Sequence, residues 1–144
     1  MKKSTVTLII ENSKGEILLL LRDNKEDIPF PNQWYILGGS AEEGELPIDA
    51  IKREIKEEIE IELPELSLHK VYNWPEKIEY VYNIKMDLDL ERTPLNEGQK
   101  LQYFSQVEIE GLDLGFHDKE IALDYFSTRI KENNNEMRSS WKLS

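Results

Sequence analysis

Three glutamates share one face of a short segment in the first half of the chain. Glu54, Glu57 and Glu58 are spaced i, i+3, i+4, so on a helix they fall within an arc of about 100°. Like charges on adjacent turns repel one another by roughly 0.2–0.5 kcal/mol per exposed pair. Such a face is either a solvated acidic surface balanced by bases such as Lys56, or a set of oxygen ligands for a hard divalent cation. The spacing alone permits both.

The surrounding sequence predicts the helix that positions these acids. Pro47 suits a first helical turn, and the pattern extends to about Ile59. Four isoleucines fill the neighbouring arc, as expected for a helix packed on a core: Ile48, Ile51, Ile55 and Ile59. The helix is therefore expected to bury isoleucine while it presents carboxylates along the border.

The spacing of residues around the helix decides between the two interpretations of the acidic face. The sequence from Gly38 to Ile61 is GGSAEEGELPIDAIKREIKEEIEI. It resembles the Nudix box, the signature of the Nudix hydrolase superfamily, which reads G-x5-E-x7-R-E-U-x-E-E-x-G-U, with U a bulky aliphatic residue. The positions that match in register are Gly39, Glu45, Arg53, Glu54, Ile55, Glu57, Glu58 and Ile61. A match at this many fixed positions is far more specific than a lone acidic run. The segment is therefore interpreted as a metal site of MutT type.

One position departs from the pattern. Glu60 stands where the family has glycine. Glycine adopts the left-handed conformation after a helix at little cost in free energy, whereas a residue with a Cβ atom is disfavoured there by about 1 kcal/mol. The helix is therefore expected to end differently here, and Glu60→Gly is expected to keep activity and to be neutral or stabilising.

The resemblance implies the metal ligands and the cofactor. Glu54, Glu57 and Glu58 match the family's metal-binding glutamates, and the carbonyl of Gly38 completes the set. The implied cofactor is Mg²⁺, a hard cation that takes carboxylate oxygens together with substrate phosphates and water. Mn²⁺ is a candidate substitute.

The resemblance also implies how those ligands are supported. Arg53 and Glu45 match the family's buried pair, in which the arginine steadies the loop and orients the metal carboxylates. Gly39 is placed where the backbone comes close to phosphate, because glycine allows that approach.

The attacking water needs a carboxylate base, and two candidates remain open. The family carries this base either in the helix, here Glu57, or on a later loop. Glu97 in the sequence Asn96-Glu97-Gly98-Gln99 is the loop candidate, because some MutT-type relatives carry a glutamate in a similar setting. The alternative for Glu97 is an ordinary acidic residue in a turn.

Arg22 and four aromatic residues are the candidates for holding substrate. Arg22 ends a predicted strand, where it either lies near substrate phosphates or pairs with Asp23 or Glu26 at the surface. The aromatics are candidates for stacking on a base, with core packing as the alternative for each: Phe30, Trp34, Tyr72 and Trp74. Trp34 is the one assigned to the substrate site. His69 and His117 show no partner pattern of a ligand or base.

Composition limits the remaining function classes. The formal charge of −11, from 18 lysines and arginines against 29 acids, argues against a nucleic-acid polymer as partner. Cysteine is absent, which excludes disulfides and thiolate metal sites. No apolar run is long enough for a membrane span or a signal peptide. We expect a cytoplasmic protein, monomer or homodimer, with a small-molecule nucleotide as its partner.

The predicted elements give an α/β fold, a Nudix-like α/β/α sandwich with a mixed β-sheet between helices. A hairpin of Val6–Ile10 and Ile17–Leu21 is expected first, then a strand at Trp34–Leu37. Further strands are predicted at 66–72, 78–88 and 99–104, and a closing amphipathic helix at 118–130. Residues 1–131 are interpreted as one domain and residues 132–144, with Trp141, as a polar tail.

Together these patterns predict Mg²⁺-dependent hydrolysis of a phosphoanhydride bond. The expected substrate is a nucleoside triphosphate, oxidised ones included, cleaved to monophosphate and pyrophosphate. A nucleotide-sugar or dinucleoside-polyphosphate hydrolase, and a nucleotide-binding domain without catalysis, are the alternatives.

Overall fold

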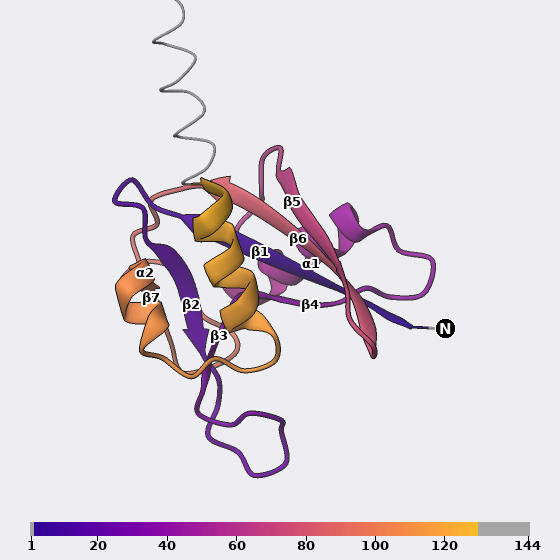
Figure 1. Cartoon of the computed structure of the whole chain (residues 1–144), viewed down its shortest axis with the longest axis horizontal. Coiled ribbons are helices and arrows are strands. Elements are labelled where there is room, and N and C mark those ends of the chain that lie inside the picture. Colours follow the sequence, from indigo (N-terminus) through magenta and orange to yellow (C-terminus); the bar gives the residue numbers. More distant parts are fainter. Residues whose placement is uncertain (1, 130–144) are drawn as a thin grey trace, which may run out of the picture.

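A mixed β-sheet forms the centre of the computed structural model, which describes residues 2–129 (Figure 1). The elements in chain order are β1 (Lys3–Glu11), β2 (Ile17–Leu21), β3 (Trp34–Tyr35), β4 (Gly38–Ser40), α1 (Pro47–Ile59), β5 (Ser67–Asn73), β6 (Lys77–Lys85), β7 (Lys100–Phe104) and α2 (Gln106–Glu110). Residues 118–129 are also helical. The sheet runs in the order β3-β2-β1-β6-β5, with β4 paired to β1 and β7 to β2.

β1 is the strand that organises the site. It pairs in parallel with β6 over its whole length, from Lys3 opposite Lys77 to Glu11 opposite Lys85. On its other side β4 pairs antiparallel at Thr5–Thr7. The predicted β1–β2 hairpin is confirmed, but the two strands pair only where Glu11 faces Ile17. Their separation leaves room for β4 beside β1.

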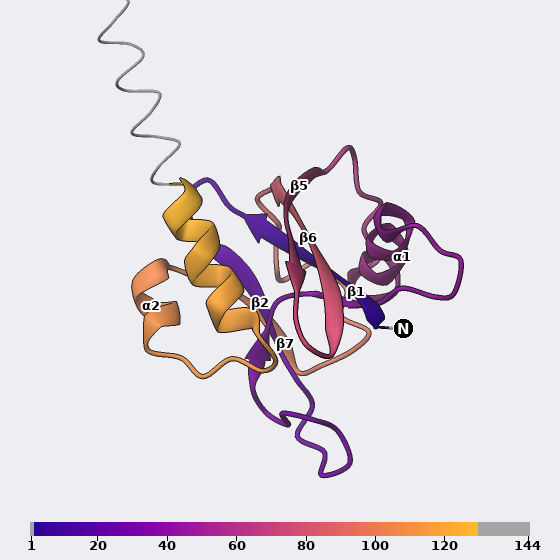
Figure 2. The same ribbon diagram turned by 45° about the vertical axis from the view of Figure 1, so that its right-hand side comes forward.

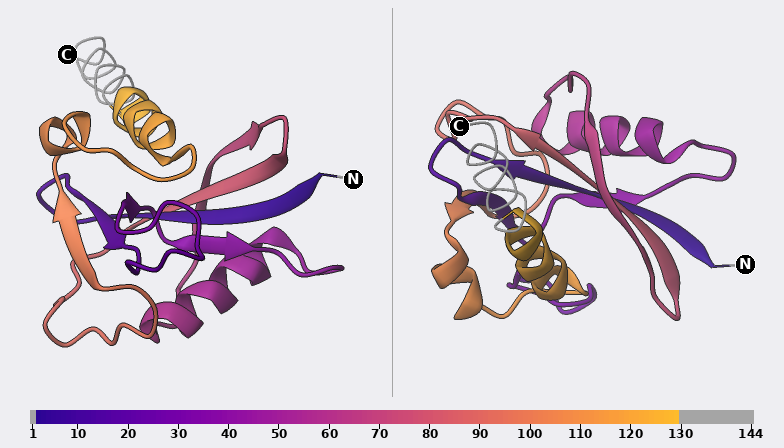
Figure 3. Two further views of the ribbon diagram at one scale, coloured as in Figure 1. Left: turned by 90° about the horizontal axis from the view of Figure 1, so that it is seen from below. Right: turned by 45° about the horizontal axis from the view of Figure 1, so that its top comes forward.

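Helices cover both faces of the sheet, so the predicted α/β/α sandwich is confirmed (Figure 2 and, from below, the left view of Figure 3). Successive side chains of a strand point to opposite faces of the sheet, so β1 contributes residues to two hydrophobic cores. Leu8 and Ile10 pack with the isoleucines of α1, whereas Ile9 packs with the helix at 118–129. Burial of each of these large side chains stabilises the fold by about 1.5–3 kcal/mol relative to exposure.

The predicted strand at Trp34–Leu37 is wrong in its extent. The chain forms two short strands instead, β3 paired with β2 and β4 paired with β1. Between them the Ile36 N–H donates to the side chain of Asp118 rather than to a strand (2.7 Å). This side-chain bond satisfies a buried amide where the sheet ladder is interrupted.

Other elements also differ from the prediction, most of them by a few residues at an end. β6 ends at Lys85 rather than at Leu88. The short helix α2 was not predicted, although its capping box is present: the Ser105 hydroxyl accepts from the Glu108 N–H, and the Glu108 carboxylate accepts from the Ser105 N–H.

The predicted tail at 132–144, including Trp141, lies outside the described residues. Within residues 2–129, no helix has both the length and the apolar character needed to span a bilayer.

Candidate active site

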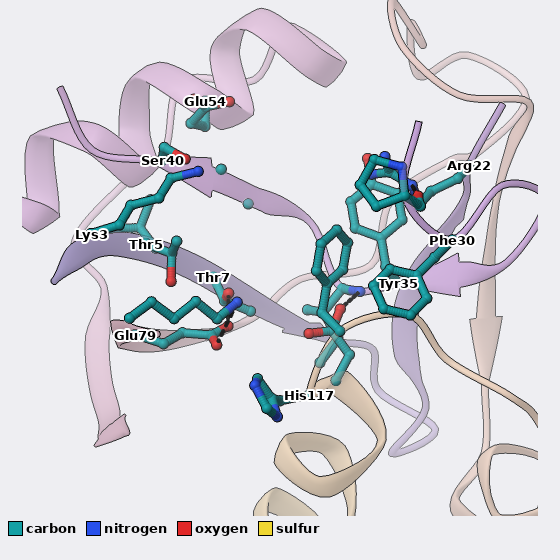
Figure 4. A pocket seen from close by; sticks show the side chains of 18 of the residues that line it. Lys3, Thr5, Thr7, Arg22, Phe30, Tyr35, Ser40, Glu54, Glu79 and His117 are labelled. Carbon is teal, nitrogen blue, oxygen red and sulfur yellow. Dashed lines mark hydrogen bonds and ion pairs between the residues drawn. The ribbon is translucent and has the colours of Figure 1, made fainter. Parts of the chain in front are cut away.

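A cavity of about 780 Å³ lies beside β1 and extends from α1 to the start of the 118–129 helix. Figure 4 shows Glu54 of α1 at one end and Arg22, Phe30 and Tyr35 at the other. We call the first the carboxylate end and define it by Gly38, Gly39, Ser40, Glu54, Glu58 and Glu97. We call the second the aromatic end and define it by Arg22, Phe30, Tyr35, Ile36, Phe116 and Asp118.

Three acids from two segments line the carboxylate end. Glu54 and Glu58 come from α1, and Glu97 comes from the loop before β7. Glu58 is only 3% exposed, and its Oε2 has no hydrogen-bond partner. Burial, and then the charges of Glu97, Glu54 and Glu57, raise the pKa of Glu58 to about 9. Burial also raises the pKa of Glu54, against the lowering effect of Arg53.

Glu57 does not line the cavity. Its side chain is 59% exposed and accepts from Arg53 Nη1 at 3.3 Å. Within the described part of the chain, no three acidic or histidine side chains come close enough together to hold a metal ion. The structure thus brings two of the three implied helix ligands into the cavity, with Glu97 beside them.

The carboxylate end nevertheless has the chemistry of a cation site. A buried carboxylate oxygen without a donor costs free energy unless a cation or a proton compensates it. Glu58 Oε2 is such an oxygen, and the neighbouring acids add negative charge. A divalent ion that prefers oxygen ligands would neutralise this cluster.

Arg53 connects the loop to the helix through the contacts that the Nudix resemblance implied. Its Nε and Nη2 donate to the two carboxylate oxygens of Glu45 at 2.9 and 3.0 Å, a bidentate pairing. Nη2 also donates to the Ser40 carbonyl, and Nη1 to Glu54 Oε1 at 3.1 Å. The hydrogen bond from Arg53 lowers the pKa of Glu45. The pair is partly exposed rather than fully buried, at 25% and 16%.

The two glycines of β4 lie in close contact with other groups, Gly38 with the backbone of β1 and Gly39 with the side chain of Glu54. A Cβ atom on Gly38 would lie 2.0 Å from the Val6 carbonyl oxygen, and one on Gly39 would lie 2.3 Å from the Glu54 carboxyl carbon. Real Cβ atoms essentially never approach so closely. Gly39 therefore allows the Glu54 carboxylate to lie directly against the backbone of β4.

Arg22 belongs to the cavity. Its guanidinium lies over the rings of Tyr35 and Phe116, 5.2 and 5.3 Å from their centroids, and its Nε donates to the Pro29 carbonyl. No ion pair joins it to Asp23 or Glu26 in the described part of the chain. Arg22 thus lies in the cavity rather than in an ion pair with either acid, and its contact with substrate stays a prediction.

Trp34 does not line the cavity, contrary to its predicted place in the substrate site. Its ring packs edge-on against Phe104 at 4.7 Å in the core on the other face of the sheet. Successive side chains of a strand point to opposite faces, so the neighbouring Tyr35 faces the cavity instead. Tyr72 and Trp74 also lie elsewhere, stacked on each other at 5.3 Å, whereas Phe30 does line the cavity.

Asp118 is the main residue of the aromatic end that sequence reasoning missed. It is 4% exposed, and its Oδ2 accepts from the Ile36 N–H at 2.7 Å. Burial, and then the charge of Glu79, raise its pKa to about 8. The preceding Phe116 has a positive φ of 57° and packs against Phe30 at 4.9 Å. The only sequence signal was an acid at the start of the predicted last helix, a common N-terminal preference.

Another part of the cavity wall carries a polar network around the buried Glu79. Glu79 is 2% exposed and accepts from the Thr7 hydroxyl at 2.6 Å and from Trp74 Nε1 at 3.0 Å. Lys77 pairs with the same carboxylate at 3.3 Å. His117, for which no partner was predicted, contacts Glu76 through Nε2 at 2.5 Å and stacks on Trp74. These contacts join the β5–β6 turn to the loop that carries Phe116.

Comparisons with known proteins agree with the fold and with the motif. The model of the NUDIX domain matches residues 1–125. A nucleoside triphosphatase NudI from Escherichia fergusonii is 34% identical over 73 residues, 51% of this chain and 48% of that protein. The chain therefore spans about half the length of the curated relative it matches.

Solved structures of other proteins share the same fold. A NUDIX hydrolase from Nitrosomonas europaea superposes with a TM-score of 0.73 at 25% identity, over 90% of this chain and 73% of that one. A MutT protein from Methanosarcina mazei Go1 superposes with a TM-score of 0.68 at 24% identity, over 92% and 95% of the two chains.

Proposed function

The chain belongs to the NUDIX domain family, and on that premise we propose that it hydrolyses the α–β phosphoanhydride bond of a nucleoside triphosphate, releasing a monophosphate and pyrophosphate. The observation that carries this proposal is the buried, unpartnered Oε2 of Glu58, which lies in a cavity shared with Glu54 and Glu97. Such a cluster suits a cation that accompanies phosphate.

Mg²⁺ is the proposed cofactor, with Mn²⁺ as a substitute. Glu54 and Glu58 would hold it with the carbonyl of Gly38, and Glu57 would join them on leaving Arg53. When bound, the ion stabilises negative charge on the phosphoryl oxygens and acidifies a coordinated water. Arg53 would still connect the loop to the helix after Glu57 leaves it, because its bonds to Glu45 and to the Ser40 carbonyl do not involve the metal ligands.

The proposed reaction needs one proton acceptor, and Glu97 is our candidate. Water forms the new bond to the α-phosphorus while the bond to the bridging oxygen breaks, and pyrophosphate leaves with that oxygen. The proton of the water passes to the Glu97 carboxylate, which lines the same end of the cavity as the metal ligands. Glu57 is the weaker candidate because its side chain lies outside the cavity, against Arg53.

The aromatic end supports a nucleoside as the other part of the substrate. Ligand cavities of about 300–1,000 Å³ that combine apolar walls with a few polar groups are typical of small-molecule sites, and this cavity has about 780 Å³. Phe30 and Phe116 have aromatic rings on which a base could stack, and the Asp118 carboxyl could form a hydrogen bond with the base. Arg22 lies among them and brings a positive charge for phosphate.

A substrate panel tests this proposal. Nucleoside triphosphates, oxidised triphosphates, nucleotide sugars and dinucleoside polyphosphates are each incubated with Mg²⁺, and released phosphate and pyrophosphate are assayed separately. We expect pyrophosphate from a triphosphate, no release in EDTA, and a kcat/KM about 10³-fold lower for Glu58→Gln. Cleavage of nucleotide sugars alone would move the proposal to another substrate class. Binding without turnover of any substrate would overturn it.

A further inference from the structure

We propose that Asn96 is a positioning residue, which fixes Glu97 at the carboxylate end by capping the last carbonyls of α1. This inference rests on the proposed function, because it explains how the candidate base is held relative to the metal ligands. It concerns a residue outside the Nudix box, on a loop that the box does not specify.

The side chain and the backbone of Asn96 both bond to the end of the helix. The Asn96 N–H donates to the Glu58 carbonyl at 2.8 Å, and Nδ2 donates to the Glu57 carbonyl at 2.9 Å. A second, exposed bond runs from Nδ2 to Glu60 Oε2 at 3.2 Å. The last carbonyls of a helix have no partner within it, so these bonds satisfy groups that would otherwise need water. The residues they cap, Glu57 and Glu58, are two of the implied metal ligands.

The other side of the loop is fastened to β2. The Gln99 N–H donates to the Leu21 carbonyl at 2.8 Å, and Gln99 Nε2 donates to the Arg22 carbonyl at 2.6 Å. Gly98 has a φ of +86°, and a Cβ there would lie 2.2 Å from Leu20 Cδ2. Only glycine therefore lets the loop approach β2 this closely.

Glu97 is held between these two attachments. Its backbone is fixed relative to α1 by Asn96 and relative to β2 by Gln99, so the backbone that carries the candidate base cannot move without breaking bonds on one side. Misplacement of a reacting group by about 1 Å can cost on the order of 100-fold in rate. Asn96 itself supplies a neutral donor, which caps the helix without adding charge beside the acids.

A kinetic double-mutant cycle tests this role. Asn96→Ala should lower kcat about 10- to 100-fold and leave KM and the Mg²⁺ concentration for half activation within about threefold. In a Glu97→Gln background the same substitution should lower kcat no further, because the group it positions is already gone. Losses that multiply in the double variant would overturn the proposal, since Asn96 would then act through α1 rather than through Glu97.

Amide hydrogen exchange gives a readout that does not depend on turnover. In the wild type the amides of Asn96 and Gln99 should be protected, and Asn96→Ala should speed their exchange at least about tenfold. Ser105→Ala is the matched control, because it removes a polar cap on α2 away from the cavity, and it should change neither this exchange nor kcat. Unprotected amides in the wild type, or exchange unchanged by Asn96→Ala, would overturn the proposal. If the wild type cleaves no substrate, the proposed function fails while this experiment still decides whether Asn96 holds the loop.

Discussion

The two ends of the cavity each contain a buried acid, but the two acids differ in their partners. Glu58 and Asp118 have pKa values raised to about 9 and about 8, in both cases chiefly by burial. Asp118 Oδ2 accepts from a backbone N–H, whereas Glu58 Oε2 has no donor. A carboxyl with one satisfied oxygen suits hydrogen-bond recognition, and one with an unpartnered oxygen among other acids suits a cation. Similar burial therefore supports two different tasks.

The ends also differ in how the chain builds them. Most of the carboxylate end comes from a short run of sequence, β4 followed by α1, and only Glu97 is distant. The aromatic end combines a loop before β3, the end of β2 and the loop that precedes the 118–129 helix. The first can be recognised from spacing, whereas the second exists only once the sheet has formed.

The largest effect is expected at the unpartnered acid. Glu58→Gln should lower kcat/KM about 10³-fold, because a metal ligand and its charge are lost. Its melting temperature without metal should not fall, since the uncharged amide has nearly the same shape and removes a buried carboxylate that lacks a donor. Kinetics and thermal unfolding measure the two effects. Turnover within tenfold of wild type would remove the distinction between the two ends.

A slightly smaller loss is expected from the backbone that supports Glu54. The Cβ of Gly39→Ala would overlap the Glu54 carboxylate, so the carboxylate must move and kcat should fall about 100-fold. Gly44→Ala is the matched control: its φ is +79° but nothing lies within 4 Å of the new Cβ. That control should cost about 1 kcal/mol of stability with turnover nearly unchanged. Equal losses of activity in both variants would point to general loop strain.

The aromatic end should respond in affinity and in pH dependence. Asp118→Asn keeps an acceptor oxygen for the Ile36 N–H, but it replaces the titratable carboxyl oxygen with an NH2 group that only donates. KM should therefore change about tenfold, and selectivity among bases should shift. Metal activation should stay as in wild type. A variant with unchanged KM for every base would show that Asp118 does not contact substrate.

Stability against pH gives a second test of Asp118. With its pKa raised in the folded state, Asp118 stabilises the fold fully below its usual pKa near 4, and this stabilisation is lost as the pH rises to about 8. The amide in Asp118→Asn does not titrate. The free energy of unfolding of this variant should therefore gain on wild type by at least about 1 kcal/mol between pH 4 and pH 8, as measured by denaturant titration. A constant difference would show that the pKa of Asp118 is not raised in the folded protein.

The smallest effect is expected at the position that departs from the Nudix box. α1 ends with Glu60 in the left-handed conformation, φ 56° and ψ 40°, so the expectation that the helix ends differently is wrong. Glycine relieves that conformation by up to about 1 kcal/mol, while the exposed bond from Asn96 to Glu60 is lost. Glu60→Gly should be neutral or slightly stabilising in thermal unfolding, with kcat within about threefold. A tenfold loss of turnover would contradict this assignment.

The sequence was informative wherever a pattern is local. α1 begins and ends where Pro47 and the isoleucine spacing placed it. The resemblance to the Nudix box implied the Arg53–Glu45 pairing, which the structure contains. Trp34 was assigned to the cavity, but side chains alternate along β3, and Tyr35 is the one that faces the cavity. The predicted strand also ends after Tyr35, where the distant Asp118 side chain accepts from the Ile36 N–H. No local pattern encodes that contact. Asp118 and Phe116 were missed for the same reason, since their surroundings come from other segments.

Metal binding as a function of pH tests the central claim most directly. Mn²⁺ binding to the wild type and to Glu58→Gln can be followed by electron paramagnetic resonance at pH 6.5 and pH 8.5. Because the pKa of Glu58 is raised to about 9, the ion must displace a proton, and wild-type affinity should rise about tenfold or more across this range. Glu58→Gln should bind weakly at both values. Tight binding by Glu58→Gln, or a wild-type affinity independent of pH, would contradict the assignment of the metal to the carboxylate end.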